Sequence, residues 1–341
     1  MAIKKGASDV HINVGAHPLL RIDGRLLPVT SEPPLTLEKV KELIKEISTP
    51  EAEKKLESRQ EVDFSFEYDH TRFRTNIYLQ KELPAASLRL INSDIKSYTE
   101  LGLPPIIEHF TAQSQGLVII TGPTGHGKST TLASMIQRIN LERREHIITI
   151  EDPIEYLFKN EKSLISQREV GTDTLSFANA LRGALREDPN VVLIGEMRDL
   201  ETIESALVMA ETGHLVLTTL HTNSAAQTVD RIVSVFPAFQ QQQIRSQLAS
   251  VLIGVMSQRL IPKIASGRVV ASEVMIANAA IRTLIRENKI HQIPNVIQTS
   301  ASEGMILLDK VLAELISRGE ISLEDALAWS VSPKSLKMMV Y

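Results

Sequence analysis

The chain of 341 residues contains no cysteine, and this absence excludes disulfide bonds, thiol nucleophiles and zinc sites built on thiolates. Aromatic residues make up only 4% of the chain, so few platforms for base stacking are expected. The 41 Asp and Glu residues outnumber the 37 Lys and Arg residues, so the chain lacks the excess of basic residues that is typical of nucleic-acid-binding proteins. No window approaches the roughly 18 consecutive apolar residues of a membrane span, and no apolar core typical of a signal peptide follows Met1. The composition favours a globular protein with room for two domains, compatible with a reducing cytoplasm.

The most specific motif is the stretch 122–129, which reads Gly-Pro-Thr-Gly-His-Gly-Lys-Ser. Its two outer glycines stand five positions apart and a Lys-Ser pair follows, as in the phosphate-binding P-loop. An apolar run at 117–120 predicts a buried strand before the loop, and the spacing of apolar residues after it predicts a helix over 129–140. Lys128 is expected to reach the β- and γ-phosphates of a nucleotide, and the Ser129 hydroxyl to bind Mg²⁺.

Three further apolar runs each end in polar residues. The run 147–150 precedes Glu151, Asp152 and Glu155. Taken alone, these acids fit two interpretations equally well: an ordinary charged loop, or a site that positions Mg²⁺ or accepts a proton. The run 191–194 precedes Glu196, which resembles a Walker B strand with Glu in place of the usual Asp. The run 215–220 precedes His221, which is expected to sense the γ-phosphate, whereas His214 lies at the opposite end of that strand.

The first 96 residues show a different pattern, in which short alternating strands flank helices. Strands are expected between 7 and 29 with a hairpin turn at Asp23-Gly24, helices over 36–47 and 50–59, and further strands over 62–79 and 85–91 with a turn at Asp69-His70. Alternation places Arg74 and Arg89 on the outward face of this sheet. Taken alone, both arginines read as ordinary surface charges.

The stretch 101–105, which reads Leu-Gly-Leu-Pro-Pro, is a stiff break, and we place the domain boundary there. We therefore expect an N-terminal α+β domain over 1–96, a linker over 97–105 and an α/β domain over 106–341. Strands and helices alternate after the break, which predicts a parallel sheet. Beyond residue 240 the pattern predicts mostly helix, over 240–258, 278–287, 303–318 and 322–329.

Taken together, these segments resemble the secretion ATPase superfamily, and within it the type IV pilus retraction (twitching-motility) ATPases. The resemblance covers nearly the whole chain. Its motifs, in chain order, are GASDVHINVG, RIDG, GPTGHGKSTT, ITIEDPIEYLF, QREVGTDTLSFANALRGALREDPNVVLIGEMRD, GHLVLTTLHTNSAAQTVDRIVSVFP and AIRTLIRENK. The acidic, Glu196-bearing and His221-bearing segments resemble the family's Asp, Walker B and His boxes, and residues 280–289 resemble a signature tied to retraction.

The resemblance implies a PAS-like N-terminal domain and a RecA-like P-loop NTPase core, with nucleotide bound between the two domains of each subunit of a homohexamer. It implies ATP hydrolysis with Mg²⁺, an inner-membrane pilus platform protein as partner, and a place at the cytoplasmic face of the inner membrane. Glu155 would be the general base, Glu196 would hold Mg²⁺ directly or through water together with Ser129, and Arg74 and Arg89 would close over the γ-phosphate. The catalytic set is thus Glu155, Glu196, Arg74, Arg89 and His221, and the nucleotide-binding set is Gly122, Pro123, Thr124, Gly125, His126, Gly127, Lys128, Ser129 and Thr130.

The sequence departs from the family at His126, where Ser or Ala is usual. Its side chain is expected to point away from the phosphate cradle, so ATP binding should survive with altered kinetics. The nearest alternative function is a pilus assembly or type II secretion ATPase, although such relatives usually carry a four-cysteine zinc element that this chain lacks. Two more distant hypotheses are a nucleic-acid translocase and a nucleotide-binding protein without hydrolysis. The charge balance disfavours the translocase, and the presence of Glu155 and Glu196 disfavours the protein without hydrolysis.

Overall fold

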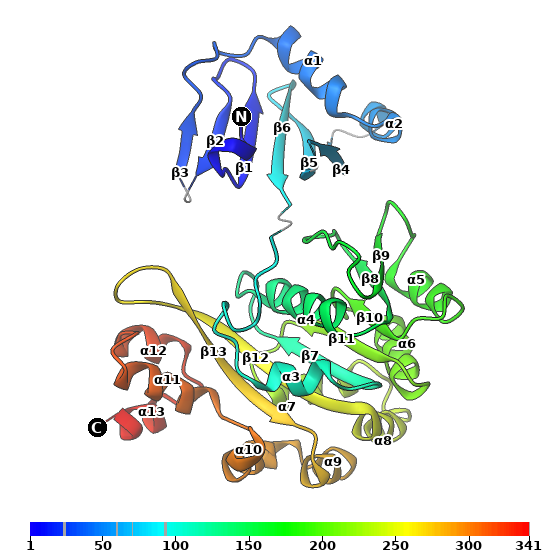
Figure 1. Cartoon of the computed structure of the whole chain (residues 1–341), viewed down its shortest axis with the longest axis vertical. Helices are drawn as coiled ribbons and strands as arrows, with labels where there is room; N and C mark the ends of the chain where they lie inside the picture. Colours follow the sequence, from blue (N-terminus) through cyan, green and yellow to red (C-terminus); the bar gives the residue numbers. More distant parts are fainter. Residues whose placement is uncertain (23–24, 59–60, 70, 92–93, 341) are drawn as a thin grey trace. The chain divides into compact units, whose positions relative to one another are not determined.

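A computed structural model describes residues 1–22, 25–58, 61–69, 71–91 and 94–340. The chain forms two compact units (Figure 1). The first comprises Met1–Asp94 together with Pro153–Leu157, and the second comprises Ile95–Asp152 together with Phe158–Tyr341. The stretch 97–105, expected to be a linker, therefore belongs to the second unit, where Leu103 is buried in the core.

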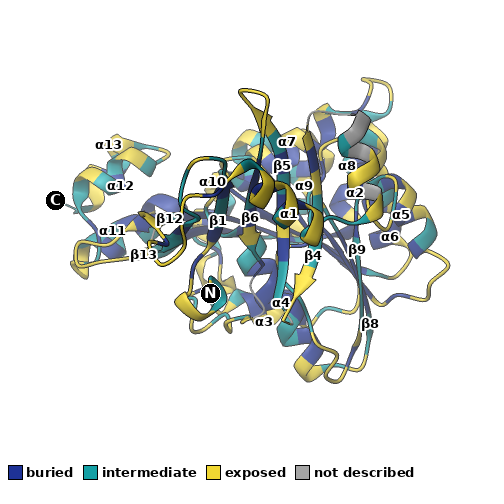
Figure 2. Cartoon of the chain, turned by 90° about the horizontal axis from the view of Figure 1, so that it is seen from above, coloured by how far each residue is buried: buried dark blue, intermediate teal, exposed yellow. Residues whose placement is uncertain are grey.

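The first unit is built on a six-stranded antiparallel sheet, ordered β3-β2-β1-β6-β5-β4. Thr36 begins the longer helix by accepting a hydrogen bond from the backbone N–H of Lys39, and this helix buries Val40 and Ile44 while most of its other residues remain exposed or half-buried (Figure 2). The expected turns at 23–24 and 69–70 include residues 23, 24 and 70, which lie outside the described residues. The elements are η1 (Ile3–Lys5), β1 (Asp9–Asn13), β2 (Leu19–Ile22), β3 (Arg25–Pro28), α1 (Leu37–Ile47), α2 (Pro50–Ser58), β4 (Glu61–Tyr68), β5 (Thr71–Gln80) and β6 (Leu83–Leu90).

The second unit is built on a seven-stranded sheet, ordered β13-β12-β7-β11-β10-β8-β9. The strands from β12 to β9 run parallel to their neighbours, and β13 pairs antiparallel with β12 at one edge. The strands are β7 (Gly116–Thr121), β8 (His146–Glu151), β9 (Leu164–Glu169), β10 (Val191–Ile194), β11 (Leu215–Leu220), β12 (Leu252–Pro262) and β13 (Arg268–Ile276). The helices are α3 (Ile106–Thr111), α4 (Lys128–Glu142), α5 (Phe177–Ala184), α6 (Leu200–Glu211), α7 (Ala225–Ser234), α8 (Gln241–Val251), α9 (Ala279–Arg286), η2 (Ile290–Gln292), α10 (Ile293–Thr299), η3 (Ala301–Glu303), α11 (Leu308–Ser317), α12 (Leu323–Trp329) and α13 (Pro333–Val340).

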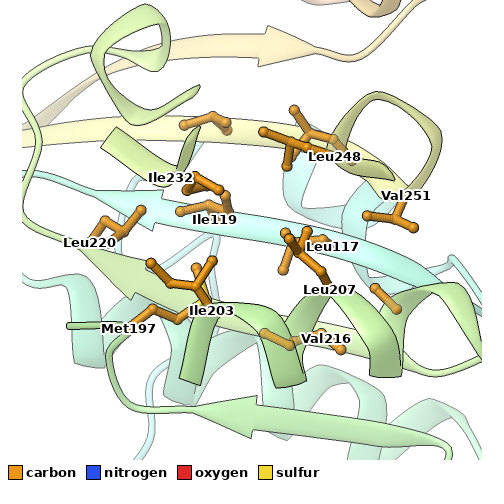
Figure 3. Close-up of a cluster of buried hydrophobic side chains, with 14 of the residues drawn as sticks. Leu117, Ile119, Met197, Ile203, Leu207, Val216, Leu220, Ile232, Leu248 and Val251 are labelled. Carbon is orange, nitrogen blue, oxygen red and sulfur yellow. The ribbon is translucent and has the colours of Figure 1, made fainter. Parts of the chain in front are cut away.

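Both faces of this sheet are covered, which explains why its strands read as continuous apolar runs. Alternate residues of β7 enter two different clusters: Leu117 and Ile119 pack with α6, α7 and α8 (Figure 3), whereas Val118 and Ile120 pack with α3 and α4. Within the described ranges, no helix combines the length and apolar content needed to cross a bilayer.

The prediction of a helix over 240–258 is wrong in its second half. Helix α8 ends at Val251, and β12 begins at Leu252 and pairs with β7 on one side and β13 on the other. The stretch is buried on both faces, so its apolar residues follow no strict period of two and resemble a helical stripe. This strand matters for the site, because it lies directly beside the strand that leads into the phosphate loop.

The C-terminal helices α11, α12 and α13 pack together around Leu312 and Leu336, against Ile261 of β12 and Ala271 of β13. Asp309 fixes the link between the last two helices, since its carboxylate accepts hydrogen bonds from the backbone N–H groups of Val331 and Ser332 at 2.9 and 2.8 Å. Residues 331–340 are thus an integral part of the second unit, although no motif of the sequence was assigned to them.

Candidate functional site

The phosphate loop lies between β7 and α4. Gly122, Gly125 and Gly127 have φ values of 145°, 80° and 80°, which side chains with a Cβ adopt at a cost, so the loop shape depends on these glycines. The loop leads into the first turn of α4, and the N-terminus of a helix attracts phosphate. Ser129 and Thr130 stand in this first turn.

Lys128 folds back over the loop rather than toward solvent. Its buried Nζ donates to the carbonyl oxygens of Gly122 at 2.9 Å and Pro123 at 3.0 Å. These carbonyls hold the ammonium group at the loop before nucleotide arrives. When nucleotide binds, a phosphate oxygen would replace them as the acceptor.

His221 connects the loop to the end of β10. Its Nδ1 lies 3.5 Å from Lys128 Nζ, and its Nε2 lies 3.2 Å from an Oε atom of Glu196. A neutral imidazole with its proton on Nε2 satisfies both contacts, accepting from the ammonium and donating to the carboxylate. The other Oε atom of Glu196 contacts Arg198 at 2.5 Å, and the Glu196 side chain is only 13% exposed. Three predicted site residues, Lys128, His221 and Glu196, therefore form one connected chain of contacts.

These side chains meet because β10, β11 and β7 are adjacent parallel strands whose carboxyl ends share one edge of the sheet. Hydroxyl groups brace that edge: Thr219 donates to the carbonyl of Gly195 at 2.6 Å, and Thr121 contacts Thr222 at 2.7 Å. His214 lies at the other end of β11, where its Nδ1 donates to the carbonyl of Met209, which is a structural contact.

The acids at the end of β8 and just after it are divided between the two units. Glu151 accepts a hydrogen bond from Thr149 at 2.6 Å and lies at the end of β8 in the second unit. Glu155 is an exposed residue of the stretch Pro153–Leu157, which belongs to the first unit. Its predicted role as general base therefore stays a prediction.

Arg74 and Arg89 are directly opposite each other on β5 and β6, and both are exposed. Directly opposite residues of an antiparallel pair point to the same face. Asp9 on β1 is opposite Arg89, which donates to it at 2.9 Å. Burial alone raises the pKa of Asp9, but the hydrogen bond and charge of Arg89 together with the Ser8 hydroxyl lower it overall. The exposed face thus carries a pair of arginines, as the alternation predicted.

Residues of β12 that sequence reasoning missed complete the support of the phosphate loop. Gln258 donates to the carbonyl of His126 at 2.6 Å and accepts from the Thr131 hydroxyl at 2.8 Å. Arg259 donates to Asn223 at 3.0 Å, in the segment after His221. A run of polar residues within an apolar stretch, 257–259, was the one available signal.

Comparison with known proteins gives consistent matches along the chain. The family described as "Type II/IV secretion system protein" matches residues 1–267. The "Type IV pilus retractation ATPase PilT" of Pseudomonas aeruginosa is 49% identical over 324 residues, covering 95% of this chain and 94% of the relative. A "Twitching motility protein" of Neisseria gonorrhoeae is 48% identical over 91% of this chain and 83% of the relative.

A solved structure, the pilus retraction motor PilT with bound ADP, superposes with a TM-score of 0.94 at 50% identity, covering 99% of this chain and 97% of that one. The predicted fold, a P-loop α/β core with a smaller N-terminal α+β domain, is confirmed by this match and by the two sheets described above. The chain belongs to the Type II/IV secretion system protein family.

Proposed function

We propose that this chain is an ATPase motor that hydrolyses ATP with Mg²⁺ and uses the energy to retract type IV pili. The observation that carries the proposal is the contact chain Lys128–His221–Glu196 beside a glycine-dependent phosphate loop. The retraction ATPase and twitching-motility protein among its relatives support the assignment to pilus retraction.

The residues present fit a magnesium ion. Mg²⁺ prefers hard oxygen ligands and is usually bound through one or two protein oxygens plus substrate phosphates. The Ser129 hydroxyl at the start of α4 and the half-buried Glu196 carboxylate provide such oxygens, with Glu196 acting directly or through water. When bound, the ion would neutralise charge on the phosphate oxygens.

The protein's own part in hydrolysis divides among four groups. Loop N–H groups and Lys128 bind the phosphates, and Glu155 accepts the proton of the attacking water as an O–P bond forms and the bond from Pγ to the bridging oxygen breaks. His221 holds Glu196 in place and, through Lys128, joins the phosphate loop to the end of β10. Arg74 and Arg89 stabilise charge on the γ-phosphate, and their shared exposed face supports this role.

As a motor, the chain acts as one subunit of a homohexameric ring at the cytoplasmic face of the inner membrane. The ring passes nucleotide-driven domain motion to a pilus platform protein. The resemblance to retraction ATPases is the support for this assembly and partner.

A phosphate-release assay on purified protein tests the activity. We expect Mg²⁺-dependent ATP turnover, and none for Lys128→Ala, because that variant lacks the ammonium that binds the phosphates. Wild-type protein that binds ATP but releases no phosphate would overturn the proposal. Deletion of the gene in the native host separates the two motor types: persistent pili without twitching support retraction, whereas loss of pili indicates assembly.

A further inference from the structure

His126, at the tip of the phosphate loop, makes contacts that a Ser or Ala cannot make. Its Nδ1 accepts a hydrogen bond from the backbone N–H of Leu260 in β12 at 2.9 Å. Its ring meets the ring of Trp329 edge to face, with centroids 4.7 Å apart and an interplanar angle of 68°. Such aromatic contacts contribute more to stability than the buried area alone would give.

The backbone of the same residue is also held by β12, because the His126 carbonyl accepts from Gln258. The backbone and the side chain of this loop residue are therefore bound to Gln258 and Leu260, two positions apart on a strand that is itself paired on both sides. The position of residue 126 is in this way coupled to β12.

Trp329 is firmly placed as well. It is the last residue of α12, and Asp309 accepts hydrogen bonds from the backbone N–H groups two and three residues after it. The ring of Trp329 is half-buried and packs with the core of α11, α12 and α13. Contact with Trp329 thus connects the loop to the whole C-terminal helical group.

We propose that His126 is a positioning residue for the nucleotide site, which binds the phosphate loop to β12 through Leu260 and to the C-terminal helices through Trp329. This inference rests on the proposed function, since it assigns the loop to nucleotide. The helices α11–α13 accordingly hold the loop in its binding shape. Nucleotide binding in the loop should in turn change the surroundings of these helices.

The protonation state of His126 fits this role. Because Leu260 N–H is a donor, Nδ1 must be unprotonated for the bond to exist. Burial, followed by the charges of Arg259, Lys128 and Arg268, lowers the pKa of His126 below its usual value of 6.5. The ring is therefore neutral at pH 7, with its proton on Nε2.

Trp329 is the chain's single tryptophan, so tryptophan fluorescence reports the surroundings of this one ring. Protonated imidazole quenches a neighbouring indole. We expect wild-type emission to fall as pH drops below about 6.5, and His126→Ser to abolish that transition. His291→Ser, a change at an exposed histidine, should retain it. At pH 7.5, ADP should change wild-type emission, and His126→Ser should respond far less.

The KM and kcat for ATP distinguish a residue that positions the phosphate loop from one that only stabilises the fold. We expect Trp329→Ala to raise the KM for ATP about fivefold, as loss of one ring contact produces. His126→Ser loses both the hydrogen bond and the ring contact and should raise the KM by at least about fivefold, with kcat nearly unchanged in both variants. His126→Asn keeps an acceptor at the place of Nδ1 and should recover most of the hydrogen bond, and Trp329→Phe should recover most of the ring contact. A double variant no more impaired than His126→Ser would support a shared contact.

The inference is overturned if wild-type protein hydrolyses ATP while His126→Ser matches it in KM and in its fluorescence response to ADP. It is also overturned if His126→Asn is as impaired as His126→Ser and Trp329→Phe as impaired as Trp329→Ala. A wild-type protein without ATP turnover would instead contradict the proposed function, so the two failures are distinct.

Discussion

Replacement of Gly122 by Ala tests how the phosphate loop is held against β12. A Cβ added at Gly122 would lie 2.4 Å from the backbone oxygen of Gln258, and the residue has a φ of 145°. Gln258 cannot move aside easily, because it pairs with Ser272 in β13 and its neighbour Ser257 pairs with Thr121 in β7. The loop must therefore shift instead, which displaces the backbone that meets the phosphates.

Gly125 provides a matched control in the same loop. It also has a positive φ, 80°, but a Cβ there would meet open space. Gly125→Ala should cost about 1–2 kcal/mol for the left-handed backbone alone. Gly122→Ala should cost about 1–3 kcal/mol for backbone strain and a further 1–3 kcal/mol or so for the close contact.

The close contact, present only in Gly122→Ala, should weaken ADP binding about 5–150-fold beyond the control. Titration of a fluorescent ADP analogue into each purified variant with Mg²⁺ measures this difference. Circular dichroism and thermal melting without nucleotide show whether both variants remain folded. If folded Gly122→Ala binds ADP as tightly as Gly125→Ala, the account of a loop packed against β12 is refuted.

Three further predictions concern charge. Glu196→Gln should still bind ATP but release phosphate at least about 100-fold more slowly, because it removes the carboxylate at the end of β10. Arg74→Ala should lower kcat by about 10³ or more with little change in KM; Arg89→Ala should in addition lower the melting temperature, because it deprives buried Asp9 of its 2.9 Å partner. Burial raises the pKa of Glu273 above its usual 4.5, so ionisation of this carboxyl opposes folding. As pH rises from 4.5 toward the raised pKa, the melting temperature of the wild type should therefore fall relative to that of Glu273→Gln.

Arg25→Ala is the control for the arginine variants, since Arg25 is an exposed residue of β3 in the same sheet. An Arg74→Ala enzyme as active as Arg25→Ala would show that Arg74 has no part in catalysis. Wild-type turnover by Glu196→Gln would remove Glu196 from the mechanism. Parallel melting curves for wild type and Glu273→Gln at every pH would contradict the linkage argument.

The sequence predicts much of the second unit because its strands are unusual. Parallel strands covered on both faces need uninterrupted apolar residues, and the polar residue that ends each run marks the edge where the site forms. Lys128, Glu196 and His221 follow such runs or the glycine loop, and they meet in the structure. The expected outward face of Arg74 and Arg89 follows from the period of two in the same way.

The missed features depend on tertiary contacts. Strand β12 contains Gln258 and Arg259 among apolar residues, and their polarity makes sense only when the phosphate loop and Asn223 are present as partners. It also follows α8 with no turn residue between them, so a local pattern cannot locate the change from helix to strand. Likewise, no sequence rule pairs His126 with a tryptophan two hundred residues away.

A crystal structure of the full chain with Mg²⁺ and a non-hydrolysable ATP analogue shows whether Lys128 and Glu196 meet the nucleotide. We expect the terminal phosphate to lie in the loop at 122–127, with an oxygen at hydrogen-bond distance, about 3 Å, from Lys128 Nζ, and with the Glu196 carboxylate turned toward the site. An analogue bound elsewhere, with Lys128 still donating to the carbonyls of Gly122 and Pro123, would contradict this expectation.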